Sequence, residues 1–206
     1  ELATVAEGIY KIAATSYELT QAQVRVNLQV AGAAVVGRAS LDRKRQVAYE
    51  VENQITGEKK KLAVPSLVIG AENVSQQTGL VDGLTDSMGS AITIFLVIPE
   101  GLLPVSTTVR TPEGSRALGT YVPADSPVYR ACAGGETYFG RVFVLNDWYI
   151  AGYQPILDDS GSVIGVICAG VRQSNLDVLR EKILSFQIGR TGSPYIMDSW
   201  RGRSGL

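Results

Sequence analysis

The chain of 206 residues contains no histidine. Histidine is the most frequent general base near neutral pH, and it is also the commonest transition-metal ligand in proteins. The glycine-rich dinucleotide loop, the Walker loop, the G-x-S-x-G elbow and the S-x-x-K pattern are missing as well. We therefore expect neither an enzyme nor a bound cofactor or metal ion.

Cysteine is scarce too, with only Cys132 and Cys168 in the sequence. Two cysteines cannot build a zinc knuckle or a disulfide framework. Each lies in an apolar run, where a buried and unreactive thiol is the usual state. A single disulfide between the two remains possible on the sequence alone.

The sequence shows no excess of charge and no long apolar run. A net charge of −1 gives no support for a nucleic-acid partner, although residues 43–45 and 59–61 form two basic clusters that we expect to be a solvated rim. The longest apolar run, around Ile94–Ile98, has about eight residues, whereas a membrane span needs about 20. Because the chain begins at Glu1 and not at a methionine, we expect a fragment excised from a longer protein.

A heptad pattern covers residues 1–42, with Ser16 and Gln23 as the only polar exceptions. It predicts one helix of about 60 Å, which is longer than a small domain requires. This length favours a coiled-coil-like stalk, while a helix lying entirely on its own domain is the alternative. The apolar members of the heptad frame are Leu2, Val5, Ile9, Ile12, Leu19, Val26, Val30 and Ala33.

From Gln46 onward the period changes to the alternation of strands. A hairpin is expected over 46–55 and 62–69, with Pro65 at an edge or bulge, followed by a short helix within 74–88. Further strands are predicted at 92–98, 105–109, 141–145, 148–157 and 163–171, with a helix at 127–133 capped by Asp125 or Ser126 and a helical face at 176–184. Tight turns between strands favour antiparallel pairing, so the fold class is α+β: a long N-terminal helix packed on an antiparallel sheet of about five strands.

A candidate binding site follows from strand 148–157. Alternation places Tyr149 and Tyr153 on one face, and Tyr138 lies just before the preceding strand. Arg116 follows the turn after strand 105–109, and Thr107 shares the face of Val105 and Val109. A guanidinium fork among hydroxyl groups suits a small carboxylate, because it can bind both oxygens. The alternative is that the tyrosines belong to the core and the arginine is solvated.

Five segments carry a resemblance to a known family. They are TPEGSRALGT (111–120), PVY (127–129), GETYFG (135–140), WYIAGYQPI (148–156) and GSVIGV (161–166). In order and spacing they resemble the extracytoplasmic Cache sensor domains, and more narrowly the single-Cache or Cache 3–Cache 2 fusion type of bacterial methyl-accepting chemotaxis receptors and sensor kinases. Together with the preceding helix, the resemblance covers roughly residues 1–185.

The resemblance implies a PAS-like antiparallel sheet, a helix that descends from a transmembrane segment, and a pocket for a small organic acid. Its polar lining would be Arg116, Tyr138, Tyr149 and Tyr153, with Thr107 as a further member. Because the histidine found in some relatives is missing, a monocarboxylate such as acetate or propionate is favoured over citrate. The implied protein is a periplasmic sensor of an inner-membrane chemoreceptor, dimeric through its N-terminal helix.

The resemblance also divides the chain into a membrane-proximal stalk (1–42), a sensor domain (43–185) and a tail (186–206). The tail is either an extra strand or the start of a further Cache unit, with partial disorder. Three other hypotheses remain open at this point. The chain could be the sensor of a histidine kinase, a ligand-free structural or partner-binding module, or a hydrolase that works without the usual base.

Overall fold

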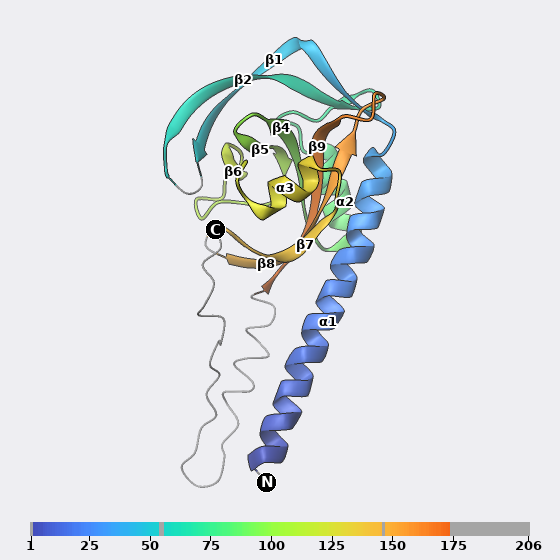
Figure 1. Cartoon of the computed structure of the whole chain (residues 1–206), viewed down its shortest axis with the longest axis vertical. Helices are drawn as coiled ribbons and strands as arrows, with labels where there is room; N and C mark the ends of the chain where they lie inside the picture. Colours follow the sequence, from blue (N-terminus) through green and yellow to red (C-terminus); the bar gives the residue numbers. More distant parts are fainter. Residues whose placement is uncertain (1, 54–55, 146, 174–206) are drawn as a thin grey trace.

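The computed structural model describes residues 2–53, 56–145 and 147–173. The predictions for the helical face at 176–184 and for the tail at 186–206 lie outside the described residues. The chain forms a long helix, α1 (Leu2–Val35), beside a strongly curved sheet that carries two short helices (Figure 1). The remaining elements are β1 (Ala39–Asn53), β2 (Lys59–Ile69), β3 (Glu72–Asn73), α2 (Gly79–Met88), β4 (Ala91–Ile98), β5 (Gly101–Thr107), β6 (Thr120–Pro123), α3 (Pro127–Ala133), β7 (Tyr138–Val144), β8 (Asp147–Leu157) and β9 (Val163–Arg172).

Helix α1 ends at Val35, so the prediction of a helix as far as residue 42 is wrong at its C-terminal end. Gly37 adopts a left-handed backbone conformation with φ of +66°, a conformation that glycine accepts at little cost, and the first strand starts at Ala39. The upper part of the helix packs on β8 and β9. Its buried apolar face consists of Val24, Leu28, Ala31 and Val35.

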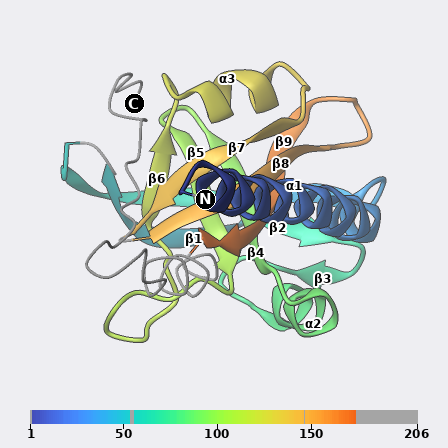
Figure 2. The same ribbon diagram turned by 90° about the horizontal axis from the view of Figure 1, so that it is seen from below.

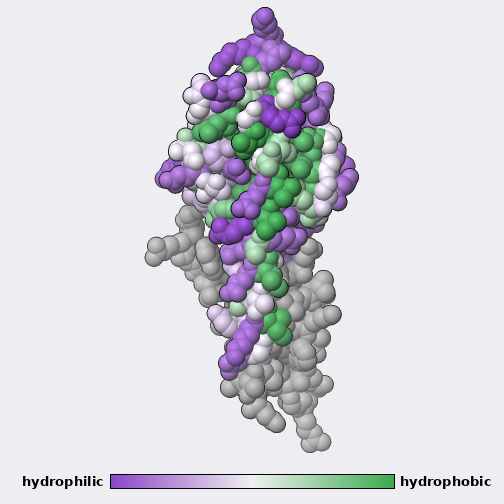
Figure 3. Space-filling model, turned by 90° about the vertical axis from the view of Figure 1, so that its right-hand side faces the viewer, coloured by the Kyte–Doolittle hydropathy of each residue, from purple (hydrophilic) through white to green (hydrophobic). Residues whose placement is uncertain are grey.

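From Ile12 onward, the predicted apolar heptad positions lie on a different face of α1. Ile12, Leu19, Val26 and Val30 are all exposed, Leu19 to 66%. Apolar groups are visible along the outward side of the helix in Figure 3. One face of the helix therefore packs on its own domain, while a second apolar stripe faces away from it.

The sheet has nine strands in the order β3-β2-β1-β6-β5-β4-β9-β8-β7. The α+β class with an N-terminal helix on a mostly antiparallel sheet is confirmed, but the predicted number of about five strands is wrong. Two short strands, β3 and β6, were not expected from the sequence. Strand β6 also makes the one parallel contact among the described strands, through Glu52–Thr120 and Asn53–Tyr121.

Strands β1 and β2 form a long arm that arches over the rest of the sheet (Figure 1). The register jumps from Asp42–Ser66 to Gln46–Pro65, so residues 43–45 bulge out of the ladder opposite the proline. This confirms the prediction for Pro65, which has no amide hydrogen to donate. The basic residues of the bulge are exposed, as expected for a rim.

The two faces of the main sheet bury separate apolar clusters, because successive strand residues point to opposite sides. Ile92, Ile94 and Ile167 pack with α1 and α2 on one face. Phe95, Val166 and Tyr153 pack with α3 on the other face. Figure 2 shows α2 and α3 on opposite sides of the molecule. None of the helices that the structure describes combines the length and the apolarity required to cross a membrane.

Candidate functional site

Five polar side chains form a straight row across the α3 face of the sheet. The pairs are Thr107–Thr93, Thr93–Cys168, Cys168–Tyr153 and Tyr153–Tyr138, each directly opposite in its ladder. Directly opposed residues in antiparallel strands point to the same side, so the five side chains share one face. This polar row crosses β5, β4, β9, β8 and β7 in turn.

A row of small residues lies beside the polar row, one step further along each strand. Ala91 pairs with Gly170, Gly170 with Ala151, and Ala151 with Gly140. The ring of Tyr138 covers Gly140 closely, since a Cβ on that glycine would lie 2.6 Å from the Tyr138 hydroxyl oxygen. The sheet therefore presents a small-residue floor (Ala91, Gly140, Ala151 and Gly170) next to a row of hydroxyl and thiol groups.

Tyr149 borders this floor on the side away from the polar row. A Cβ on Gly170 would lie 3.4 Å from Cδ1 of Tyr149, in ordinary van der Waals contact. Tyr149 is paired with Val142 and packs in the same buried cluster as Tyr153. The structure thus brings together Tyr138, Tyr149 and Tyr153, three of the five residues expected to line a site. Thr107 lies on the same face but at the opposite end of the polar row, four strands from Tyr138 and about 19 Å away at the usual strand spacing.

Tyr153 is the most buried of these aromatic residues, with only 3% of its surface exposed. Its ring centroid lies 6.2 Å from that of Tyr138 in an edge-on arrangement and 6.0 Å from that of Phe95. Burial raises the pKa of its phenol well above the usual value. The hydroxyl is therefore a neutral group that can donate a hydrogen bond at any physiological pH.

Helix α3 covers this cluster with Val128 and Cys132. The Ser126 side chain caps the helix by accepting a hydrogen bond from the Tyr129 amide, which settles the predicted choice between Asp125 and Ser126. Pro127 occupies the first turn, where a missing amide hydrogen costs nothing. The Cys132 thiol lies 3.8 Å from the Tyr153 carbonyl oxygen, so α3 contacts the polar row directly.

Both cysteines are free and buried. Burial raises the pKa of Cys132 to about 11 and that of Cys168 to about 12. Both thiols are thus protonated at neutral pH and are poor nucleophiles. The disulfide that the sequence left open is not formed in this structure.

Sequence reasoning missed Thr93 and Cys168 as members of the row. The hydroxyls of Thr93 and Thr107 lie 2.7 Å apart and are both buried. The one available signal was that Thr93 is the only polar residue in the apolar strand 91–98. The pairing of β4 with β9, which brings Cys168 beside it, could not be read from the sequence.

Arg116 takes no part in the tyrosine cluster. Its guanidinium group donates to both carboxylate oxygens of Asp82 in α2, at 2.7 and 3.0 Å, and to the carbonyl oxygen of Thr107 at 2.8 Å. The hydrogen bond from Arg116 holds the pKa of Asp82 below its usual value. Arg116 therefore lies at the Thr107 end of the polar row, with its fork occupied by a carboxylate that the sequence analysis did not single out.

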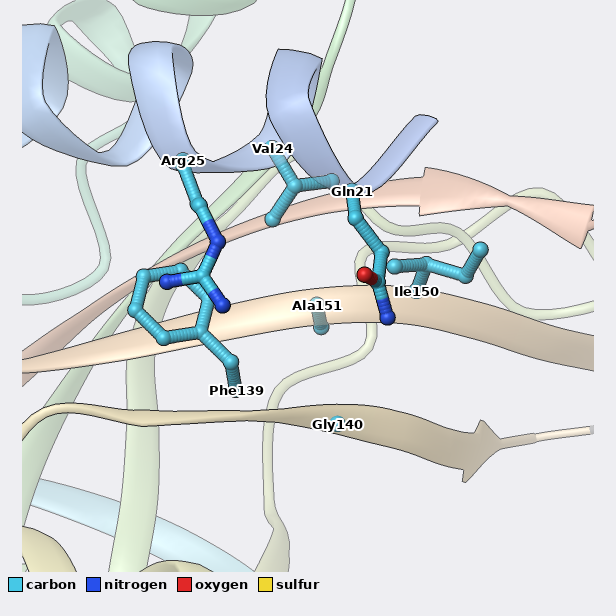
Figure 4. A pocket seen from close by; sticks show the side chains of 7 residues that line it. All are labelled: Gln21, Val24, Arg25, Phe139, Gly140, Ile150 and Ala151. Atoms are coloured by element: carbon cyan, nitrogen blue, oxygen red, sulfur yellow. The ribbon is translucent and has the colours of Figure 1, made fainter. Parts of the chain in front are cut away.

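A small hollow lies elsewhere, between α1 and strands β7 and β8 (Figure 4). It is lined by Gln21, Val24, Arg25, Phe139, Gly140, Ile150 and Ala151. The Arg25 guanidinium lies over the Phe139 ring at 4.2 Å from its centroid. With a volume of about 10 Å³, the hollow has room for about one water molecule. It is therefore too small for an organic ligand.

The sequence was also compared with known proteins. A family model described as the Cache 3/Cache 2 fusion domain matches residues 1–205. No curated protein matches the chain. The family match spans the long helix, the arm and the strands that carry the polar row.

Proposed function

The chain belongs to the Cache 3/Cache 2 fusion family of extracellular ligand-binding sensor modules. On this premise we propose that it is the sensor domain of a bacterial chemoreceptor and that it binds a small monocarboxylate. In this proposal the module lies in the periplasm and its parent protein is anchored in the inner membrane. Ligand binding would change the position of α1, which would pass the change toward the membrane. A ligand can do this only by binding one arrangement of the protein more tightly than another.

The observation that carries the proposal is the polar row beside the small-residue floor on the α3 face. Tyr138 and Tyr149 offer hydroxyl groups that can donate to a carboxylate. The Thr107 hydroxyl is buried against that of Thr93 at the other end of the row, so it would serve only a ligand at that end. The floor has no side chain larger than alanine, and the rings of Tyr138 and Tyr149 lie over it. In this proposal a ligand of a few heavy atoms takes the space above the floor when these rings move aside. These features favour acetate or propionate over a branched polycarboxylate.

The charge needed to hold an anion would come from Arg116, at the Thr107 end of the row. A guanidinium group remains protonated at every physiological pH and can bind both oxygens of a carboxylate. In the ligand-free protein its guanidinium group contacts the carbonyl oxygen of Thr107 and Asp82 of α2, which lies on the side of the molecule opposite to α3. In this proposal the group turns from Asp82 toward the Thr107 end of the row when an acid binds there.

The exposed stripe on α1 supports the expected homodimer. Ile12, Leu19, Val26 and Val30 recur at heptad spacing and are solvent-exposed in the single chain. Such a stripe is typical of helices that pair along their length. Two chains would therefore associate through α1, with their sheets on the outside.

Thermal melting against a panel of small acids tests the ligand class. A ligand present at 100 times its dissociation constant stabilises the fold by about 2.7 kcal/mol, which is readily seen as a higher melting temperature. Tyr149→Phe removes one hydroxyl from the proposed site, so it should reduce the shift caused by acetate or propionate. Tyr10→Phe is the matched control, since Tyr10 is exposed on α1.

Two results would contradict the proposal. One is a wild-type melting temperature that no acid in the panel changes, which would favour a ligand-free module with the tyrosines as core. The other is an equal shift in wild type and in Arg116→Ala, which would remove the carboxylate from the proposed ligand chemistry.

A further inference from the structure

The guanidinium fork of Arg116 already holds a carboxylate within the protein. Asp82 accepts from both terminal nitrogens in the bidentate arrangement that arginine forms with any carboxylate. A ligand that uses the same fork cannot do so while Asp82 occupies it. Asp82 and an acidic ligand would therefore exclude one another.

The ion pair between Arg116 and Asp82 is accessible enough to exchange partners. The Arg116 side chain is 23% exposed and the Asp82 side chain 38%. Pairs of this kind contribute little net stability, because water solvates both charges well when they separate. Only the third contact of Arg116, with the Thr107 carbonyl oxygen, is a neutral backbone bond, and it can persist while the carboxylate is exchanged.

We propose that Asp82 is a built-in competitor that occupies Arg116 in the ligand-free protein, and that a ligand carboxylate takes its place and releases α2. This inference rests on the proposed function, because it assumes an acidic ligand that reaches the Arg116 fork at the Thr107 end of the polar row. It assigns a specificity role to Asp82 that neither the sequence nor the family match indicates.

The release of α2 would reach α1 through the other end of the same short helix. Asn27 of α1 donates its side-chain amide to the Ser90 hydroxyl at 2.7 Å and to the Met88 carbonyl oxygen at 3.3 Å. Met88 is the last residue of α2, and Ser90 precedes β4. Among the α1 side chains that the structure describes, Asn27 is the only buried polar one.

A second contact ties the middle of α2 to the same loop as Arg116. The hydroxyls of Thr85 and Thr108 lie 3.1 Å apart, and Thr108 follows Thr107 directly. Helix α2 is thus joined at its first turn and middle to the segment that follows β5, and at its end to α1. A shift of α2 would change the surroundings of the buried amide on α1.

Isothermal titration with acetate and propionate tests the competition. Asp82→Asn keeps the shape of the side chain but removes its charge, so the variant should bind the acid about threefold to tenfold more tightly than wild type, the range expected for a partly exposed bidentate pair. Asp86→Asn is the matched control, because it makes the same change on the exposed side of α2. Its affinity should equal that of wild type.

Hydrogen exchange without any ligand tests the connection to α1. In Asp82→Asn, the amides of α2 and those around Asn27 should exchange several-fold faster than in wild type, and Asp86→Asn should change neither. Asn27→Ala should reproduce the effect in α1 alone. If Asp82→Asn speeds up exchange in α2 but not around Asn27, the proposed connection between α2 and α1 is wrong.

The outcomes separate this inference from the proposed function. If wild type binds an acid and Asp82→Asn binds it no more tightly, the proposed competition by Asp82 is refuted, while the proposal of an acid sensor stands. If wild type binds an acid weakly and Asp82→Asn binds it more tightly, the acid-sensor proposal and the competition by Asp82 are both supported. If neither protein binds any acid, the ligand class itself is wrong and the competitor is refuted with it.

Discussion

The hydroxyl groups of Thr93 and Thr107 lie 2.7 Å apart on neighbouring strands, buried on the α3 face of the sheet. Thr107 also accepts a hydrogen bond from the Val109 amide at 3.1 Å. The pair gives the buried Thr93 hydroxyl a partner and the Thr107 hydroxyl a second one. It also fixes the position of β5 against β4 at one end of the polar row.

Removing one hydroxyl group of this pair should lower the free energy of unfolding by more than half as much as removing both. Thr93→Val leaves the Thr107 hydroxyl with one fewer partner, and we expect a loss of about 1–2 kcal/mol in the free energy of unfolding. The double variant Thr93→Val/Thr107→Val should lose clearly less than the sum of the single losses, because the surviving partner is gone too. Urea unfolding of the four proteins measures this, and strictly additive losses would contradict it.

Gly101 should be nearly irreplaceable. Its backbone has φ of +148°, and a Cβ there would lie 1.9 Å from the carbonyl oxygen of Val122 in β6. Gly101→Ala therefore combines backbone strain with a clash against main chain, and we expect a loss of about 3 kcal/mol or more in stability. Gly161→Ala is the control: its φ is +80°, but the space around it is open, so only about 1 kcal/mol should be lost. Equal losses in thermal unfolding would disprove the clash.

The two buried thiols should make the fold less stable in alkali. The pKa values of Cys132 and Cys168 rise from 9.0 to about 11 and about 12 on folding. Their contribution is fully present below about pH 9, and it is lost as the pH rises toward the folded-state pKa values, because the unfolded chain gives up these protons first. Between pH 8 and pH 10 the free energy of unfolding should fall, by at most about 1.4 kcal/mol per pH unit and thiol.

Urea unfolding across this pH range checks the effect, with the Cys132→Ala/Cys168→Ala variant as its control. The variant should show a flatter pH dependence, and an unchanged slope would refute the assignment. Both thiols of the wild type should also resist a thiol reagent at pH 8 until the protein unfolds.

A charge on the exposed stripe of α1 should separate the proposed dimer. Leu19→Lys places an ammonium group in the middle of an apolar seam, so we expect the dimer dissociation constant to rise by at least about tenfold. Gln29→Lys adds the same charge to an exposed position outside the stripe and should have little effect. Sedimentation velocity over a range of concentrations distinguishes the two, and a dimer unaffected by Leu19→Lys would place the interface elsewhere.

Local sequence signals predicted the elements that depend on local physics. Helix 127–133 was found to the residue, since Pro127 begins it and Gly134 ends it. Strand β6 was missed because its four residues include Pro123 and make their pairs with distant segments. The heptad pattern was real, but it does not mark the face of α1 that packs on the sheet. Periodicity identifies an apolar face without identifying what covers it.

In the candidate site, too, the features that depend on local sequence were predicted and those that depend on distant segments were not. Alternation along one strand correctly placed Tyr149 and Tyr153 on one face. The polar row as a whole depends on a strand order that is not the chain order, so Thr93 and Cys168 were not recognised as neighbours. The partner of Arg116 lies on a helix that the local sequence around the arginine gives no means of anticipating.

Among the residues that the structure describes, the arm of β1 and β2 pairs with the main sheet through two residue pairs of β6. The ladder hydrogen bonds of the arm therefore run mostly between β1 and β2. Side-chain packing and a few polar contacts, such as the Lys60–Glu100 ion pair, attach the arm to the rest of the domain. The polar row lies on strands that the arm does not pair with. In evolution the arm can thus change in length, and acquire new surfaces at its outer end, without disturbing the register that sets the row.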